Sequence, residues 1–143
     1  MDKCVFCSIT KESKGEEIIF EDEHFIAFLD YTPIFKGHTL LIPKKHYQTI
    51  FDLPDGLLEK MSVVLKRLSE AVKAGTDADG ILLINNNIVS QSVPHYHIHV
   101  VPRHSGVVLK GFMWPRQKYS SGEEKDGYAR AIRDNMKRIM KEL

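Results

Sequence analysis

Three histidines alternate in the stretch Pro94-His95-Tyr96-His97-Ile98-His99-Val100-Val101-Pro102-Arg103. Its aromatic and β-branched residues, bounded by prolines, predict a β-strand. Side chains alternate between the faces of a strand, so residues two apart share one face at a spacing of about 6.6 Å. The stretch therefore predicts three imidazoles on one side and Tyr96, Ile98 and Val100 on the other. Such a row of imidazoles can bind a metal ion, or can handle phosphate and protons near neutral pH.

The bulk properties describe an ordinary globular protein. The chain has 143 residues and a formal net charge of +1, which fits one domain over 1–143 with a sizeable core. The near-neutral charge gives no reason to expect a long nucleic acid or an acidic membrane as the main partner. No apolar run approaches the roughly 18–20 residues that span a bilayer, and the N-terminal residues lack the apolar core of a signal peptide. We therefore expect a cytoplasmic protein without a membrane partner.

The apolar pattern predicts the remaining elements. Strands are expected at 18–21, 24–30, 38–42 and 80–84, and the continuous apolar run of 80–84 suggests a place at the centre of the sheet. Apolar residues at helical spacing after Pro54 predict a long helix that ends at Gly75 and buries one face. A last helix is expected over 123–143. The predicted fold class is α+β, a mainly antiparallel sheet with one long helix packed on it and a C-terminal helix.

The chain has only two cysteines, Cys4 and Cys7, in a C-x-x-C pattern. In a reducing compartment a structural disulfide is not expected, which leaves a thiol redox pair or half of a zinc site. A redox pair usually follows a strand and opens a helix, and no strand precedes these cysteines. The pattern therefore favours zinc over redox chemistry and requires two more ligands.

Polar residues directly before the histidines suit phosphate chemistry. Ser90, Gln91 and Ser92 offer hydroxyl, amide and backbone N–H donors to phosphate oxygens. An imidazole nucleophile beside such donors can attack phosphorus, form a phosphorylated or nucleotidylated histidine and release the product to water. The competing interpretation is a His-x-His metal pair that uses one or two of the three rings.

Three motifs together resemble the histidine triad (HIT) family. They are Cys4-x-x-Cys7, Gly37-His38-Thr39 with Pro43-Lys44-Lys45-His46, and Gln91-Ser92-Val93-Pro94-His95-Tyr96-His97-Ile98-His99-Val100-Val101. The resemblance covers Cys4 to about Trp114. It implies a HIT-like fold, usually in a homodimer whose sheets join across the interface. The implied activity is hydrolysis of nucleoside phosphoramidates or dinucleoside polyphosphates at the ribose-linked phosphorus, through a nucleotidyl-histidine, with a purine nucleotide as the substrate.

The resemblance also implies roles for single residues around the phosphate. His97 is similar to the nucleophile of the family, and His99 is similar to a donor to the phosphate oxygens. Gln91 and Ser92 resemble contacts with the phosphate and the leaving group. The loop before them is one residue shorter than in many members, and Asn85 is our choice for its phosphate contact. Ser90 stands where many members have glycine, so its side chain narrows the approach to the backbone N–H.

The nucleoside half of the implied substrate has its own set of residues. Asp30 resembles the carboxylate that accepts hydrogen bonds from ribose hydroxyls, with a cap at the strand end as the alternative role. Tyr31, Phe6, Ile9 and Phe28 resemble walls around the base. In the tail, Arg116 and Lys118 are candidates for contacts with the extra phosphates of a dinucleoside polyphosphate, and ordinary surface charges beside a buried Trp114 are an equal alternative.

Some members of the family bind zinc through an N-terminal C-x-x-C. The matching ligands here are Cys4, Cys7, His46 and His95, a closed Cys₂His₂ set of the structural type that is not expected to activate water. Two other functions remain as alternatives to hydrolysis. One is a nucleotide-binding module without catalysis. The other is a nucleotidyltransferase or phosphorylase, which is disfavoured because such relatives have glutamine in place of His99.

Overall fold

The computed structural model describes residues 4–12, 15, 17–109 and 116–142. Two compact units, Met1–Val107 and Val108–Leu143, make up the chain, and each is treated by itself. The first unit holds the sheet and every residue expected in the catalytic and metal sites. Trp114 lies outside the described residues.

Five strands form one sheet with the order β1-β2-β3-β5-β4, and every neighbouring pair is antiparallel. This arrangement with its helices confirms the predicted α+β class. The strands are β1 (Ile18–Glu21), β2 (Phe25–Leu29), β3 (Thr39–Pro43), β4 (Gly80–Ile84) and β5 (Ile98–Arg103).

The predicted central place of β4 is wrong. β4 is an edge strand, and β5 is its one partner among the described strands. None of its residues is fully buried, and Leu83 is 47% exposed. An apolar run predicts burial but does not say what provides it. Here part of the apolar surface of β4 stays uncovered within the chain.

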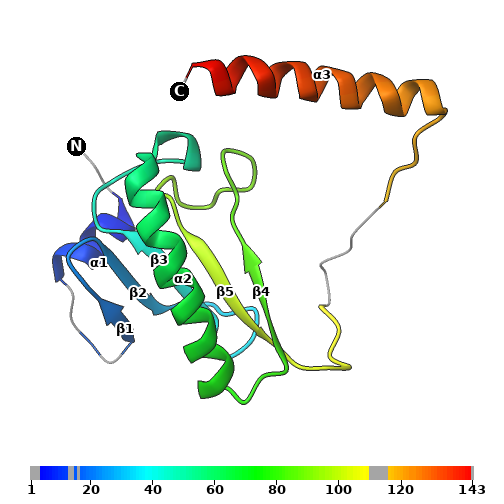
Figure 1. Ribbon diagram of the computed structural model, residues 1–143. Helices are drawn as coiled ribbons and strands as arrows, with labels where there is room; N and C mark the ends of the chain where they lie inside the picture. Colours follow the sequence, from blue (N-terminus) through cyan, green and yellow to red (C-terminus); the bar gives the residue numbers. More distant parts are fainter. Residues whose placement is uncertain (1–3, 13–14, 16, 110–115, 143) are drawn as a thin grey trace. The chain divides into compact units, whose positions relative to one another are not determined.

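The helix α2 (Asp55–Gly75) covers one face of the sheet (Figure 1). Its buried residues Met61, Leu68 and Val72 recur at helical spacing, as predicted. They join a core cluster with alternate residues of the strands, namely Phe25 and Ala27 of β2, Leu41 of β3, and Ile98 and Val100 of β5. The pleat of the sheet directs the intervening residues to the opposite face.

The opposite face carries the helix α1 (Val5–Glu12), a segment for which no element was predicted. Phe6 of α1 packs with Ile26, Phe28, Leu40 and Ile42, the strand residues that alternate with the first set. Because Ile98 and Val100 of β5 point towards α2, His99 between them points to the side of α1. The alternation along β2, β3 and β5 thus places the candidate site on the α1 face.

The predicted strand over the histidines is correct only from Ile98 onwards, and its first part is wrong. The N–H of His95 donates to Val93 O at 2.8 Å, and that of Tyr96 donates to Tyr47 O at 2.6 Å. These partners lie outside the sheet ladder, so residues 95–97 approach β5 in an irregular conformation. His95 and His97 therefore do not share a strand face with His99 by simple alternation.

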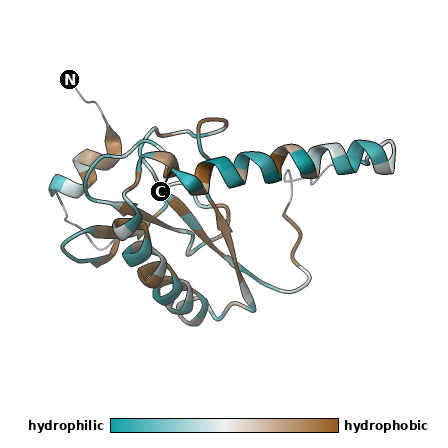
Figure 2. Ribbon diagram, turned by 45° about the horizontal axis from the view of Figure 1, so that its top comes forward, coloured by the Kyte–Doolittle hydropathy of each residue, from teal (hydrophilic) through white to brown (hydrophobic). Residues whose placement is uncertain are grey.

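The second unit contains α3 (Gly122–Lys141), close to the predicted range. Ser121 caps it, since its Oγ accepts the N–H of Glu124 at 3.0 Å, and acidic residues open the helix while Arg138 and Lys141 close it. Figure 2 shows hydrophobic and hydrophilic residues mixed along α3. None of the helices in the described ranges combines the length and the apolar character needed to cross a membrane.

Candidate functional site

A cavity of about 650 Å³ opens on the α1 face of the sheet. Its lining combines apolar side chains with the polar groups of Asp30, Ser92, His97 and His99. The remaining lining residues are Val5, Phe6, Ile9, Glu17, Phe28, Leu29, Tyr31, Thr32, Leu40 and Val93. An apolar cavity with a few convergent polar groups is the usual form of a small-molecule site.

His97 lines this cavity as a buried, neutral imidazole. Its Nδ1 lies 2.7 Å from the carbonyl oxygen of His95, and a carbonyl only accepts, so Nδ1 carries the ring proton. Nε2 is left with a free lone pair. Burial lowers the pKa of His97, against opposing effects from the His95 carbonyl and Asp30. Such a ring can act as a nucleophile at neutral pH without first losing a proton.

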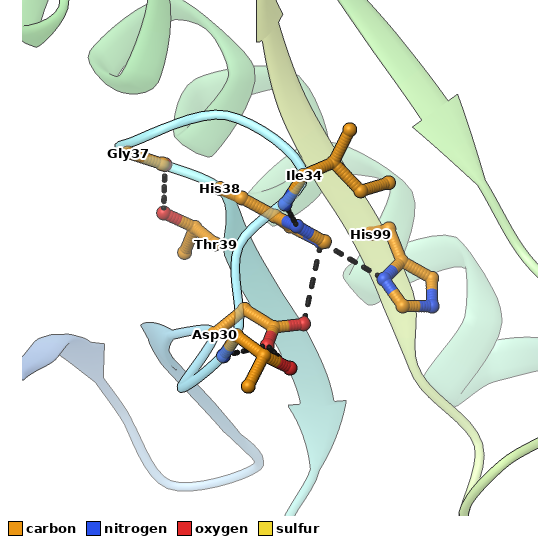
Figure 3. A network of polar contacts seen from close by, with 7 residues as sticks. Asp30, Ile34, Gly37, His38, Thr39 and His99 are labelled. Carbon is orange, nitrogen blue, oxygen red and sulfur yellow. Dashed lines mark hydrogen bonds and ion pairs between the residues drawn. The ribbon is translucent and has the colours of Figure 1, made fainter. Parts of the chain in front are cut away.

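His99 is oriented by a second histidine, His38 (Figure 3). The N–H of Ile34 donates to Nδ1 of His38 at 3.0 Å, so the proton of the neutral His38 ring is on Nε2. That Nε2 lies 2.9 Å from Nδ1 of His99 and donates to it. The proton of the neutral His99 ring is consequently on its Nε2, which makes this atom a hydrogen-bond donor.

The electrostatic environment keeps this pair of rings uncharged. Burial, followed by the neighbouring His97 and His38, lowers the pKa of His99 to about 4. Burial also lowers the pKa of His38, although Asp30, with Oδ2 at 3.5 Å from Nε2 of His38, favours the charged form. Both rings therefore act at neutral pH as polar groups with defined tautomers.

Asp30, His38 and His99 are close enough together to hold a metal ion, but their hydrogen bonds do not suit one. A metal-bound imidazole normally donates from its other nitrogen to an acceptor. The Ile34 N–H instead points at Nδ1 of His38, so metal binding at Nε2 would leave two donors facing each other. The hydrogen bonds of the cluster thus fit a hydrogen-bonded network and not a metal site.

His38 belongs to the Gly37-His38-Thr39 motif, and no role was predicted for it. The signal was a histidine at the start of a predicted strand, where a buried polar side chain needs partners. Gly37 before it has a φ of +98°, and a Cβ there would collide with Cγ2 of Thr76. Glycine is thus required for the turn that delivers His38 to His99.

Asp30 divides its carboxylate between two roles. Oδ1 accepts the N–H of Thr32 at 2.8 Å, which is the strand-end cap considered as an alternative. Oδ2 faces His38, and the residue lines the cavity. Tyr31 stands at the rim with 98% of its side chain exposed. Their predicted contacts with a nucleoside stay predictions.

Asn85 and Gln91 are not in the described lining of the cavity. Asn85 Nδ2 donates to the backbone carbonyl of His97 at 2.7 Å. Gln91 Nε2 donates to Gln48 O at 2.5 Å, and its Oε1 accepts the N–H of Ile88 at 3.3 Å. Both amides thus hold protein backbone in place, whereas Ser92 lines the cavity itself.

The loop that connects these residues has a strained backbone. Ile88 has a φ of +75° and Ser90 a φ of +62°, values in the left-handed region that favours glycine. A β-branched residue there is unusual and costs about 1–3 kcal/mol. The glycine of many HIT proteins that Ser90 replaces would relieve this strain at its own position.

The four predicted metal ligands converge beside the cavity. Nδ1 of His95 lies 3.4 Å from Sγ of Cys4, 3.5 Å from Sγ of Cys7 and 3.2 Å from Nδ1 of His46. Sγ of Cys7 lies 3.3 Å from Nδ1 of His46. Zinc bonds of about 2.3 Å to sulfur and about 2.0–2.1 Å to nitrogen give tetrahedral edges of about 3.5 Å between sulfur and nitrogen and about 3.3 Å between two nitrogens. The donor atoms therefore have the spacing of a tetrahedral Cys₂His₂ zinc site.

A further hydrogen bond supports His95 as a ligand. Its Nε2 lies 2.9 Å from the carbonyl oxygen of Pro43 and must donate to it. Nδ1 is then unprotonated and available to a metal, the arrangement typical of a metal-bound imidazole.

The tail residues Arg116 and Lys118 belong to the second unit and are exposed, and their predicted contact with phosphates stays a prediction.

Comparisons with known proteins agree with this geometry. A family model described as HIT domain matches residues 11–106. The chain is 36% identical over 118 residues to the adenosine 5'-monophosphoramidase HNT1 of Saccharomyces cerevisiae, which covers 80% of this chain and 72% of that protein. A HIT family member from Bacillus subtilis has a TM-score of 0.80 at 30% identity, over 93% of this chain and 96% of that chain. A zinc-bound histidine triad protein from Mycobacterium smegmatis has a TM-score of 0.68 at 34% identity, over 86% and 88%.

Proposed function

Because the chain belongs to the histidine triad (HIT) family, with the fold of that family, we propose that it is a nucleotide hydrolase. Its substrates are nucleoside phosphoramidates or dinucleoside polyphosphates, and it acts at the ribose-linked phosphorus. The name of the yeast relative supports the first substrate class. The observation that carries the proposal is the neutral, buried His97, whose Nδ1 is committed to the His95 carbonyl while the ring lines the cavity.

The reaction proceeds in two balanced steps. Nε2 of His97 attacks phosphorus, the bond from phosphorus to the leaving nitrogen or oxygen breaks, and the leaving group takes up a proton from the solvent. A water molecule then attacks the nucleotidyl-histidine and returns a proton to the solvent, the bond between phosphorus and Nε2 breaks, and His97 returns to its neutral form. The sum is substrate plus water giving a nucleoside monophosphate and the leaving group.

His99 and its partner supply the electrostatic part of the catalysis. Nε2–H of His99 donates to an oxygen of the phosphoryl group, and this bond strengthens as charge develops there. His38 holds the His99 ring in the donor tautomer through the 2.9 Å hydrogen bond. His38 does not itself line the described cavity, so it is a positioning residue.

The rest of the cavity recognises the nucleoside. Phe6, Ile9 and Phe28 offer apolar surface to a purine base, and Tyr31 closes the rim. Asp30 stands where ribose hydroxyls can donate to its carboxylate. Ser92 contacts the phosphate or the leaving group, and Gln91 and Asn85 support this region through the backbone they hold.

The second part of the proposal is a structural zinc ion held by Cys4, Cys7, His46 and His95. The spacing of the four donor atoms and the zinc-bound relative from Mycobacterium smegmatis support it. Four protein ligands fill a tetrahedral shell, so the ion would cross-link α1 to the sheet without activating water. Cysteines kept as thiolates for a metal suit a reducing compartment such as the cytoplasm.

The third part is a homodimer formed through the edge strand β4. Apolar Ile81 and Leu83 line a groove between β4 and α2, together with Leu65. An uncovered edge strand with apolar side chains invites pairing with another strand. A second copy of β4 would extend the sheet across the interface, as the family resemblance implies.

A substrate panel tests the proposed activity. Adenosine phosphoramidate and a diadenosine polyphosphate are offered to the wild type, to His97→Asn and to the control His104→Asn, an exposed histidine outside the lining. We expect turnover by the wild type and the control, and retained binding of adenosine monophosphate (AMP) but no turnover by His97→Asn. Rapid quenching of the wild type in alkali, in which the bond between phosphorus and a histidine nitrogen is stable, should trap a nucleotidyl adduct on His97.

The same panel decides between the alternatives. Binding without turnover by the wild type would indicate a nucleotide-binding module. Transfer of the nucleotide to added inorganic phosphate would indicate a phosphorylase or a nucleotidyltransferase. Full activity of His97→Asn would refute the assignment of the nucleophile.

A further inference from the structure

We propose that Cys4 and Cys7 also form a reversible oxidation site, at which a peroxide closes a disulfide, releases the metal and dismantles the nucleotide cavity. This inference rests on the proposed zinc site and on the proposed nucleotide site. It goes beyond both, because it makes the binding of the nucleotide depend on the redox state of the two thiols.

The helix α1 links the thiols to the cavity. Cys4 directly precedes α1 and Cys7 lies in its first turn, while Val5, Phe6 and Ile9 of the same helix line the cavity. The ring of Phe6 packs edge-on against His97, with the centroids 5.1 Å apart, and against Phe28 at 5.5 Å. Any displacement of α1 therefore removes a wall of the cavity and a neighbour of the nucleophile.

The packing of Phe6 and Ile9 and the candidate metal site connect α1 with the sheet unit. The helix has eight residues, and Phe6 is its one buried residue. A helix this short is unstable without tertiary contacts. Two of the four metal ligands come from its start, and their partners His46 and His95 belong to the body of the sheet unit. The metal site is thus a further attachment of α1, beside the packing of Phe6 and Ile9.

The two sulfur atoms are placed to react with each other. The N–H of Cys7 donates to Sγ of Cys4 at 3.4 Å, and both sulfurs lie within 3.5 Å of the same His95 nitrogen. A C-x-x-C pair at the N-terminus of a helix is an arrangement in which two thiols can form a disulfide with each other. Both cysteines are partly exposed and His46 is exposed, so a small oxidant has access to the sulfurs.

The chemistry balances with hydrogen peroxide as the two-electron oxidant. One thiolate attacks peroxide, giving a sulfenic acid and hydroxide, and the second thiolate displaces hydroxide from the sulfenic acid to form the disulfide. Two electrons pass from the two sulfurs to the peroxide oxygens, which leave as two waters after taking up two protons. The site loses both thiolate ligands, and His46 and His95 alone hold zinc weakly.

The test starts with zinc-loaded wild-type protein. Before peroxide is added, it should contain about one zinc per chain and bind AMP, as the proposed function requires. After peroxide, we expect a mass loss of about 2 Da, from the two hydrogens of the dithiol, with one zinc released to a chromogenic chelator. Hydrogen exchange of the α1 amides should accelerate. The dissociation constant for AMP should rise by about tenfold or more, the effect of losing a large apolar wall.

A double variant, Cys4→Ser with Cys7→Ser, is the matched control. It retains every methionine, so methionine oxidation occurs in both proteins, while the 2 Da loss and the change in affinity on peroxide treatment should occur only in the wild type. Dithiothreitol with added zinc should restore AMP binding to the oxidised wild type, which methionine sulfoxides would not permit.

Two results would overturn the inference alone. The first is a wild-type protein that keeps its zinc and whose two cysteines stay reduced in peroxide. The second is a disulfide form that has lost zinc yet binds AMP and protects its α1 amides as before. Absence of zinc or of AMP binding in the untreated protein refutes the proposed function, and this inference with it.

Discussion

The side-chain amide of Asn85 donates a hydrogen bond to the backbone carbonyl of His97, with 2.7 Å between the two atoms. Oδ1 of Asn85 in turn accepts from Nδ2 of Asn87 at 2.6 Å, and Oδ1 of Asn87 accepts the N–H of Ile50 at 2.7 Å. Ile50 begins the short 3₁₀ helix η1 (Ile50–Asp52). A chain of amides therefore connects η1 with the backbone of the proposed nucleophile.

We predict that Asn85→Ala lowers kcat by about 10- to 100-fold, because a small displacement of a nucleophile has effects of this size. The affinity for AMP should stay close to that of the wild type. Steady-state kinetics and calorimetry measure the two quantities, with Asn86→Ala as the neighbouring control. A phosphate contact by Asn85, the role expected from the sequence, would instead weaken AMP binding.

Substitution of His38 should act through His99. His38→Phe removes the donor to Nδ1 of His99, so we expect kcat to fall by about 10- to 100-fold. His38→Gln should retain more activity, because its amide can donate in place of the ring. Nitrogen chemical shifts of His99 report its tautomer directly. Wild-type activity and an unchanged tautomer of His99 in His38→Phe would show that the hydrogen bond from His38 to His99 has no role in catalysis.

Acid should destabilise the protein through its buried histidines. The pKa of His99 is lowered to about 4 from an ordinary value of 6.5, chiefly by burial, so between these values the unfolded chain binds more protons than the native one. The free energy of unfolding therefore falls as the pH falls from 6.5. The part of this loss that is due to His99 is complete near pH 4, where the native ring also becomes protonated. Urea unfolding at several pH values measures the slope. His99→Asn should reduce it, and a protein that gains stability on acidification would contradict the assignment.

The pH profile of the reaction should follow from the same shifts. Burial lowers the pKa of His97 as well, so the neutral nucleophile persists below the range of an ordinary histidine. We expect kcat/KM to be level at neutral pH and to fall only with an apparent pKa below 6.5, the unperturbed value. An acid limb with a midpoint above this value would assign the titration to another group.

Metal analysis should find about one zinc per chain in the wild type, as one Cys₂His₂ site requires. Cys4→Ser and His46→Ala should lose it, and their thermal unfolding should begin at a lower temperature. Lys11→Ser, on the exposed side of the same helix, should keep both the zinc and the stability. A wild type without zinc, or full zinc content in Cys4→Ser, would refute the site.

A charge on the edge strand should separate the proposed dimer. Leu83→Arg places a cation on β4 where a second sheet would pack, so sedimentation analysis should find monomers. Val63→Arg, which alters an exposed valine of α2 in a different groove, should leave the dimer intact. A wild type that sediments as a monomer at micromolar concentrations would remove the basis for the dimer.

The sequence was a good guide wherever a local period carries the information. The strands at 18–21 and 80–84 and the helix from Asp55 to Gly75 follow from alternation and from helical spacing of apolar residues. It was a poor guide for α1, where only Phe6 is buried and a short segment gives little periodicity. The prediction of a strand over His95 and His97 was wrong for another reason. The N–H of Tyr96, between them, donates to the carbonyl oxygen of Tyr47 in place of a partner in a neighbouring strand.

The sequence by itself determined which chemical groups are available to the protein, namely two thiols, a cluster of imidazoles and hydrogen-bond donors before them. It also determined the apolar periods that build a sheet with one long helix. Only the tertiary structure decided what each imidazole does. The Pro43 carbonyl leaves Nδ1 of His95 unprotonated, the His95 carbonyl leaves Nε2 of His97 unprotonated, and His38 makes Nε2 of His99 a donor. The partners of His95 and His99 come from segments far away in the chain. The tautomer of a histidine depends on which group faces each nitrogen, and that is a property of the fold.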